Sequence, residues 1–513
     1  IIDKKLPATD EFMVEGHLTG SAKALSLLDA KANAKRGPMN VVINGEVKDL
    51  IAFSGVDLKV KGSGRDLAEV GPIIGEKLPA TDDFAVQGRL MGSMKTLSLQ
   101  EAMGRASRDG MNVTVDGEIM DVLALRSMNI RLKASGKELA AIGPLIGSNL
   151  PKVGPFDVRG HLIGSAKLLL LKDLSAIVDK SDFKGLMKIE FLKRPKITVR
   201  LESSVIDFTH FMRMAEKDKR EFGVEEKRER RLFPEDPLPF DALKKVDADI
   251  LMKARNIHAK DARLEFGHLN LKLQDGDFSI DRLEATYRQT KISGNLHINS
   301  SSTPQVATNF LVQNFDLGNL LKETGVNDQI RAVIDIAAHG KSKGDSVRSL
   351  MANLDGSIGA VMGEGYLTRY LNLLSVGLSS KVAHFWGKHK KGGEIRCAVV
   401  QFDIKNGIAA SRAFVFDTEA GVLSGEGDIN LGTEQVNFLL VPKPKHLSLS
   451  FSTKLRVSGS VMDPKVRPDT LSLLSKGARA LSALVIGPLG LLAPFVSLGA
   501  HKAHPCNVHG VGK

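Results

Sequence analysis

A repeat of 72 residues is the sequence feature that most constrains how this chain can fold. The first segment of each unit reads LPATDEF, LPATDDF and LPKVGPF, at Leu6–Phe12, Leu78–Phe84 and Leu150–Phe156. The next segment reads GHLTGSAKALSL, GRLMGSMKTLSL and GHLIGSAKLLLL, beginning at Gly16, Gly88 and Gly160. A constant spacing without a flexible linker is typical of units that stack edge to edge and share one hydrophobic interior. We therefore expect a continuous elongated sheet.

Each unit is predicted to contain a few strands and one short helix. Apolar and polar residues alternate at Asn112–Gly117 and Ile130–Lys133, whereas Lys137–Ile142 has a helical pattern ended by Gly143-Pro144. Ile1 is in phase with Ile73, partway through a unit. We therefore expect the chain to be the C-terminal part of a longer repeated protein, with any targeting segment upstream.

The repeats end in a dense run of charge, Glu216–Arg231, which is typical of a solvated helix or surface loop. The proline-rich segment Phe233–Phe240 follows and breaks regular structure. The chain is thus predicted to divide into three repeats, a charged linker, a β region and a hydrophobic tail, at 1–212, 213–232, 233–470 and 471–513.

The β region shows the period-2 alternation of half-buried strands. Two-residue hairpin turns are predicted at Asp275-Gly276 and Asn406-Gly407, and Ile197–Leu201 is also strand-like. From Cys397 to Asp469 the pattern predicts an antiparallel meander, with Gln401, Asp403 and Lys405 on its polar face. The apolar residues expected on the opposite face are Leu269, Leu271, Leu273, Phe278, Ile280, Val400, Phe402, Ile404, Val436, Phe438 and Leu440.

The composition narrows the classes of partner. The 71 basic residues exceed the 59 acidic ones, and the net charge of +12 favours anionic partners. Aromatic residues make up only 5% of the chain, with Trp386 the sole tryptophan, so base-stacking platforms are not expected. The sequence also lacks a zinc-finger or RNP-like motif, and we expect no nucleic-acid binding.

One motif resembles that of a hydrolase. Gly340-Lys-Ser342-Lys-Gly344 fits the G-x-S-x-G pattern of a nucleophile elbow. That elbow requires an alternating α/β chain, whereas an antiparallel meander follows here. The motif is therefore interpreted as a polar loop, with Asp345 or Ser346 capping the next helix. No catalytic residue is predicted, and the chain is not expected to be an enzyme.

No metal or cofactor site is predicted either. His501, His504, Cys506 and His509 lie close together in the tail, but their spacing matches no standard zinc site. The glycine pairs Gly62/Gly64 and Gly425/Gly427 lack the parallel βαβ setting of a nucleotide site. With only Cys397 and Cys506 present, one bridge or two free thiols are equally compatible with the sequence.

The tail contains an uncharged stretch, Ala480–Ala500, long enough to span a bilayer. Pro488 and Pro494 argue against one regular helix, so we expect a broken segment that contacts a membrane surface. A helix covering the edge of the sheet and a true transmembrane span are the alternatives. The residues expected to contact the membrane are Leu484, Val485, Ile486, Leu489, Leu491, Leu492 and Phe495.

Several ordered blocks resemble the C-terminal region of the AsmA family. They are FPEDPLPFDALKKVDADI from Phe233, GDSVRSLMANLDGSIGAVMGEGYL from Gly344, RCAVVQFDIKNGI from Arg396, GEGDINLGTEQVNFLLVPKPK from Gly425 and VSGSVMDPKVRPD from Val457. The resemblance implies a protein of the Gram-negative envelope, related to TamB-like bridge-type lipid-transfer proteins. It also implies an N-terminal inner-membrane anchor and a bulk that lies in the periplasm.

The resemblance implies a mainly β fold with short helices, an elongated antiparallel repeat sheet curled into an open hydrophobic groove. Its implied partners are phospholipids and the membranes, and the eleven apolar residues given above, from Leu269 to Leu440, are the candidate lipid-facing residues. The resemblance brings no catalytic residue to transfer. Because the family region tends to carry a late cysteine, it also implies a bridge between Cys397 and Cys506 in an oxidising periplasm. An assembly factor that binds outer-membrane proteins by its sheet edges is the alternative function.

Overall fold

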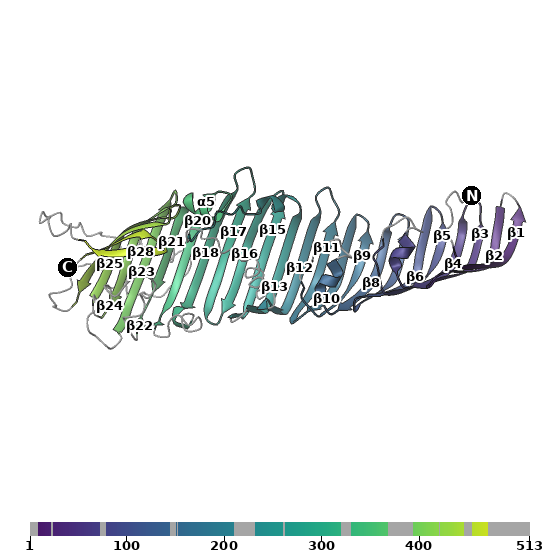
Figure 1. Ribbon diagram of the computed structural model, residues 1–513, viewed down its shortest axis with the longest axis horizontal. Helices are drawn as coiled ribbons and strands as arrows, with labels where there is room; N and C mark the ends of the chain where they lie inside the picture. The colour runs from purple at the N-terminus through teal and green to yellow at the C-terminus, as the bar shows by residue number, and fades with distance from the viewer. Residues whose placement is uncertain are drawn as a thin grey trace. The chain divides into compact units, whose positions relative to one another are not determined.

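The computed structural model describes residues 9–21, 24–71, 78–143, 150, 152–209, 231–259, 262–319, 330–367, 393–419, 421–445 and 454–469. The chain divides into two compact units. Unit 1 comprises Ile1–Phe222 and Val246–Arg263, and unit 2 comprises Gly223–Lys245 and Leu264–Lys513. Strands dominate the described part of both units, which confirms the mainly β fold with short helices (Figure 1).

Unit 1 is a sheet whose strands are joined mostly by tight turns. Its strands are β1 (Glu11–Ser21), β2 (Ala24–Arg36), β3 (Met39–Asp49), β4 (Ser54–Gly64), β5 (Asp83–Ser93), β6 (Thr96–Arg108), β7 (Met111–Asp121), β8 (Arg126–Gly136), β9 (Phe156–Ser165), β10 (Leu168–Val178), β11 (Ser181–Glu190), β12 (Lys196–Asp207) and β13 (Asp247–Ala259). Short 3-10 helices, η1 (Leu67–Val70) and η2 (Leu139–Ile142), follow β4 and β8. The helix expected at Lys137–Ile142 is present as η2, which begins two residues later, at Leu139; Gly143, expected to end the helix, has helical dihedrals, with φ −48° and ψ −51°.

The sequence repeat reappears as a repeated backbone irregularity. The second strand of each unit contains a register shift next to an acidic residue in the left-handed conformation, with φ of 50° at Asp29, 49° at Glu101 and 52° at Asp173. Such bulges bend a strand and increase its twist. Because the same bulge recurs at the repeat spacing, each unit bends its sheet at an equivalent place.

One pairing in unit 1 departs from the expected antiparallel order. β12 pairs with β13 in parallel, with Val199 opposite Ile250. Parallel neighbours cannot be joined by a tight turn, and the chain between these strands includes the stretch assigned to unit 2. The sheet is therefore mixed, and the predicted antiparallel order does not hold between these two strands.

The described part of unit 2 consists mostly of β-hairpins, with short helices between some of them. Its strands are β15 (Phe266–Gln274), β16 (Asp277–Tyr287), β17 (Thr290–Asn299), β18 (Gln305–Asp316), β19 (Ile330–Arg331), β20 (Val333–Lys343), β21 (Asp355–Met362), β22 (Gly365–Leu367), β23 (Gly393–Lys405), β24 (Ile408–Thr418), β25 (Gly421–Asn430), β26 (Gln435–Pro444), β27 (Leu455–Ser460) and β28 (Asp463–Pro468). Unit 2 also contains the short helices η3 (Phe240–Lys244) and α5 (Val347–Ala352), and β14 (Ala262–Leu264) contains the unit boundary.

The predicted turns of unit 2 are confirmed. The dihedral φ is positive at Asp275 and Gly276 (55° and 82°) and at Asn406 and Gly407 (47° and 71°). Two successive positive φ angles match the right-handed twist of the flanking strands, so these turns fix the register of the β15–β16 and β23–β24 hairpins. The meander from Cys397 to Asp469 follows as β23 to β28, each strand pairing with the next.

The interpretation of Gly340–Gly344 as a polar loop is wrong for most of its length. Residues up to Lys343 belong to β20, where Ser342 lies opposite Val306. The Ser342 hydroxyl donates a hydrogen bond to the carbonyl oxygen of Leu350 in α5. Ser346 caps α5 as expected, accepting a hydrogen bond from the N–H of Ser349.

Several predictions concern residues outside the described part of the chain. These are the charged run Glu216–Arg231, the histidine-containing tail and the uncharged stretch Ala480–Ala500 with its candidate membrane contacts. Within the described residues, no helix combines the length and the apolar character needed to cross a bilayer.

Candidate functional site

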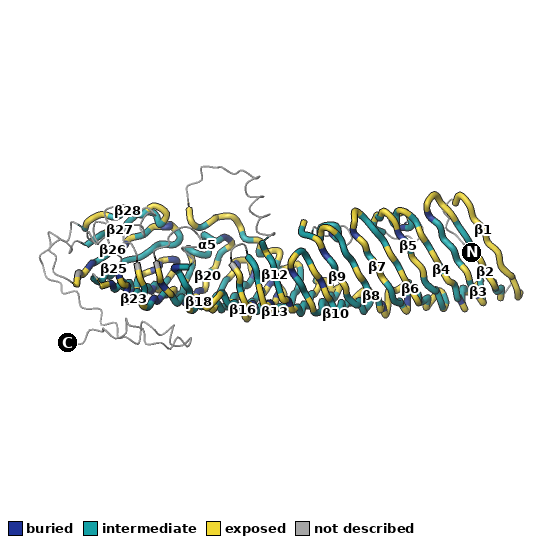
Figure 2. Tube along the Cα trace, turned by 90° about the horizontal axis from the view of Figure 1, so that it is seen from below, coloured by how far each residue is buried: buried dark blue, intermediate teal, exposed yellow. Residues whose placement is uncertain are grey.

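One face of the unit 1 sheet is apolar from strand to strand. Residues opposite one another on neighbouring strands share a face of the sheet. One unbroken row of such partners crosses β3 to β9, and we call it the unit 1 row: Val41, Gly62, Val86, Gly104, Val115, Leu132 and Gly160. Val86 is 43% exposed and Val115 is 39% exposed, so nothing in the described chain covers the middle of this face (Figure 2).

The opposite face of unit 1 is polar and carries ion pairs between strands. The guanidinium of Arg89 on β5 donates two hydrogen bonds of 2.6 Å to the carboxylate of Asp57 on β4. These bonds hold the pKa of Asp57 below its ordinary value. One repeat later the equivalent residues are His161 and Asn129, whose side chains are again hydrogen-bonded. The two faces of the sheet therefore differ consistently: one is apolar and the other is polar.

Unit 2 also has an apolar face. A second row of cross-strand partners, here called the unit 2 row, crosses β17 to β23: Gly294, Phe310, Ala338, Ile358 and Phe402. Phe310 is 38% exposed and Ile358 is 43% exposed. The strand registers place all eleven apolar residues proposed from the sequence, from Leu269 to Leu440, on this face. Two of them, Leu273 and Phe438, are buried.

The other face of β23 differs from the sequence-based expectation. Gln401, predicted to lie on a solvated polar face, is only 3% exposed, and Cys397 and Val399 beside it are also buried. Among the residues that the structure describes, the Gln401 Oε1 atom has no hydrogen-bond partner. Asp403 and Lys405 are exposed as expected. β23 is therefore covered on this side over part of its length, and Gln401 is buried although it lies on the predicted polar face.

Cys397 takes part in a disulfide. The other cysteine of the chain, Cys506, lies outside the described residues. The pairing of these two residues therefore stays a prediction.

Comparison with known proteins agrees with this architecture. The model of the AsmA family matches residues 41–414, well over half of the 513 residues and including strands of both units. The chain belongs to the AsmA family. It is also 24% identical over 420 residues to the AsmA family protein YhjG of Escherichia coli (strain K12), covering 77% of this chain and 61% of that protein. It therefore spans less than two thirds of the length of this curated relative.

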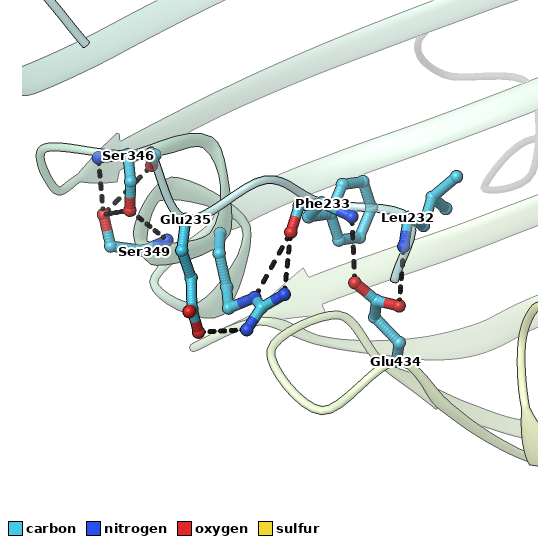
Figure 3. Close-up of polar contacts among 7 residues, drawn as sticks. Leu232, Phe233, Glu235, Ser346, Ser349 and Glu434 are labelled. Atoms are coloured by element: carbon cyan, nitrogen blue, oxygen red, sulfur yellow. Dashed lines mark hydrogen bonds and ion pairs between the residues drawn. The ribbon is translucent and has the colours of Figure 1, made fainter. Parts of the chain in front are cut away.

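In this AsmA-family chain, a segment within unit 2 is fixed by a buried carboxylate. Glu434, between β25 and β26, is 3% exposed and accepts hydrogen bonds from the N–H groups of Leu232 (2.8 Å) and Phe233 (2.9 Å) (Figure 3). Burial alone would raise the pKa of Glu434. The two N–H groups and the nearby Arg348 outweigh burial and lower the pKa below its ordinary value.

The same segment is also attached to α5. Arg348 donates from Nη2 to the Phe233 carbonyl oxygen at 3.0 Å and forms an ion pair with Glu235. Further along the segment, Pro237 forms an isolated β-bridge with Ser346. We call residues 232–238 the strap, because they join the β25–β26 turn to the start of α5.

Little in the sequence indicates the strap. Glu434 lies in a turn, where an acidic residue is ordinarily solvated, and its partners are about 200 positions earlier in the chain. The available signal was the proline-rich segment itself. Prolines keep a chain extended and reduce its capacity for regular pairing, so its remaining N–H groups need partners from elsewhere.

Proposed function

We propose that this protein conducts phospholipid between the inner and outer membranes along its apolar sheet faces. The observation that carries the proposal is the pair of unbroken apolar rows, which contain exposed valine, phenylalanine and isoleucine side chains. In unit 1 the face opposite the row is polar. Soluble proteins seldom leave so much contiguous apolar surface without a partner. A phospholipid acyl chain is a partner of matching chemistry.

The energy available to such binding is large. Each methylene group transferred from water to an apolar surface contributes about 0.8 kcal/mol, so a few methylenes already outweigh thermal energy. A row that continues from strand to strand offers similar contacts at successive positions. An acyl chain can therefore shift along the face without a large change in free energy, which is the requirement for conduction.

The membership of the AsmA family supports an envelope setting for this activity. We propose a periplasmic location, with an inner-membrane anchor upstream of this chain and contact with the outer membrane through the hydrophobic tail. The chemistry proposed requires no catalytic residue, because moving a lipid along a groove breaks no bond. Because the chain spans only part of its curated relative, the activity proposed is that of the whole protein.

Photo-crosslinking at two adjacent residues tests the proposal. A benzophenone amino acid replaces Val115 on the apolar face or Thr114 on the polar face of the same strand, β7. The proteins are incubated with vesicles of phosphatidylethanolamine and phosphatidylglycerol and irradiated. We expect lipid adducts at Val115 and background at Thr114. Equal yields at both positions, or no adduct at Val115, would contradict the proposal.

A further inference from the structure

On the apolar face of unit 2, side chains from non-adjacent strands contact one another near the C-terminal end of the sheet. Phe402 on β23, Phe414 on β24 and Phe438 on β26 form what we call the phenylalanine cluster. The ring centroids of Phe402 and Phe438 are 6.1 Å apart, and those of Phe414 and Phe438 are 5.2 Å apart. In a flat sheet, β23 and β26 would be separated by about 14 Å, since neighbouring strands lie about 4.8 Å apart. The sheet therefore curls tightly, with its apolar face inside.

Bulges and a glycine permit this curl. The register shifts between Gln401 and Phe402 on β23, and again on β24 where it pairs with β25. Bulges of this kind increase local twist and bend the strand. On β25, between the rings, a Cβ at Gly425 would lie 2.4 Å from the Phe438 ring and 2.8 Å from the Phe414 ring. Glycine at this position leaves the space in which the two rings meet.

The exposure of the face drops where the cluster begins. Along the unit 2 row, Phe310 and Ile358 are among the exposed large apolar residues. Phe402 is the next residue of the row after Ile358 and is only partly exposed, and its ring partner Phe438 is 6% exposed. Exposure of the large apolar side chains in the unit 2 row therefore ends between the paired strands β21 and β23.

We propose that the phenylalanine cluster is the end wall of the acyl-chain path on unit 2. An acyl chain lies over Phe310, Ala338 and Ile358 and stops against the Phe402 ring. This inference rests on the proposed lipid conduction and adds the position at which the chain stops. Beyond Phe402, the Phe414 and Phe438 rings occupy the apolar surface that an acyl chain would otherwise contact. A lipid can advance farther only by displacing them.

The test uses crosslinkers on either side of the wall. A benzophenone amino acid is placed at Ile358, before the cluster, or at Val457 on β27, which lies opposite Phe438 and beyond the cluster. Each is combined with the unmodified cluster or with Phe438→Ala. The proteins are irradiated with vesicles of phosphatidylethanolamine and phosphatidylglycerol. We expect lipid adducts at Ile358 in both backgrounds, and at Val457 only when Phe438 is replaced by alanine.

A matched variant controls for loss of packing. Phe310→Ala removes the same atoms from the same face, but on the near side of the wall, and should leave Val457 without adducts. Phe438→Leu, which keeps an apolar side chain in the cluster, should also leave Val457 without adducts. Adducts at Ile358 in the Phe438→Ala protein show that the apolar face is still folded.

The remaining outcomes separate the two proposals. Lipid capture at Val457 with the cluster intact would overturn the end wall while leaving conduction in place. Capture at Ile358 but never at Val457, even in a folded Phe438→Ala protein, would also overturn the assignment of the wall to these rings. Absence of capture at Ile358 in every background would overturn the conduction on which the inference rests.

Discussion

Replacing Glu434 by glutamine should release the strap. The carboxylate of Glu434 accepts the N–H groups of Leu232 and Phe233, one on each oxygen, and is almost completely buried. A glutamine side chain offers only one acceptor oxygen, so one of the two N–H groups loses its partner. A hydrogen bond to a charged group contributes about 1.5 to 3 kcal/mol, and we expect a loss of about 2 kcal/mol for the strap.

Amide hydrogen exchange measured by mass spectrometry is the appropriate assay, because it reports the opening of one segment without requiring two-state unfolding of a long repeat protein. A loss of about 2 kcal/mol corresponds to exchange about 30-fold faster in peptides covering residues 232–238. Glu426→Gln, at an exposed position on the neighbouring strand β25, is the matched control and should leave these peptides unchanged.

The same carboxylate predicts a pH dependence. The pKa of Glu434 is lower in the folded protein than its ordinary value of 4.5, so its contribution to stability is present above pH 4.5 and is lost as the pH falls through the folded pKa. Exchange in the strap, corrected for its intrinsic rate, should therefore accelerate on acidification in the native protein and much less in Glu434→Gln. Exchange that is the same in both proteins at every pH would refute the role given to Glu434.

Three further predictions concern individual contacts. Gly425→Ala should destabilise the C-terminal strands by about 1 to 3 kcal/mol, because the added Cβ would overpack against the Phe438 ring. Faster proteolysis between β25 and β27 would show this loss, and an unchanged rate would contradict it. Arg89→Gln should raise the pKa of Asp57 toward its ordinary value of 3.8, measured by carboxyl NMR titration, and an unchanged titration would show that the ion pair is absent in solution. Peptide mapping without reductant should recover Cys397 linked to Cys506, and recovery of Cys506 as a free thiol would refute that pairing.

The alternating pattern predicted the faces of the sheet well. All eleven apolar residues proposed from the sequence share one face of unit 2, because the side-chain period of a strand fixes the face once the register is set by a turn such as Asn406-Gly407. The repeat spacing likewise predicted η2 and the recurring strands of unit 1. These features depend on interactions between residues close in sequence or at a fixed interval.

Features that depend on distant contacts were not predictable. Alternation assigns Gln401 to a face but does not reveal that this part of the face is covered, so its burial was missed. The parallel pairing of β12 with β13 requires a long connection, and nothing in either strand distinguishes a parallel neighbour from an antiparallel one. For the same reason, the sequence placed Phe402 and Phe438 on one face without indicating that their rings meet across two intervening strands.

Transfer of a fluorescent phospholipid between donor and acceptor vesicles is the most direct test of lipid conduction. Val115→Asp places a charge in the middle of the apolar face, whereas Thr114→Asp places the same charge on the polar face one residue away. A buried or lipid-covered carboxylate is costly, so we expect Val115→Asp to abolish transfer and Thr114→Asp to leave it unchanged. Transfer that is unaffected by Val115→Asp, or reduced equally by both variants when both are folded, would contradict conduction along this face.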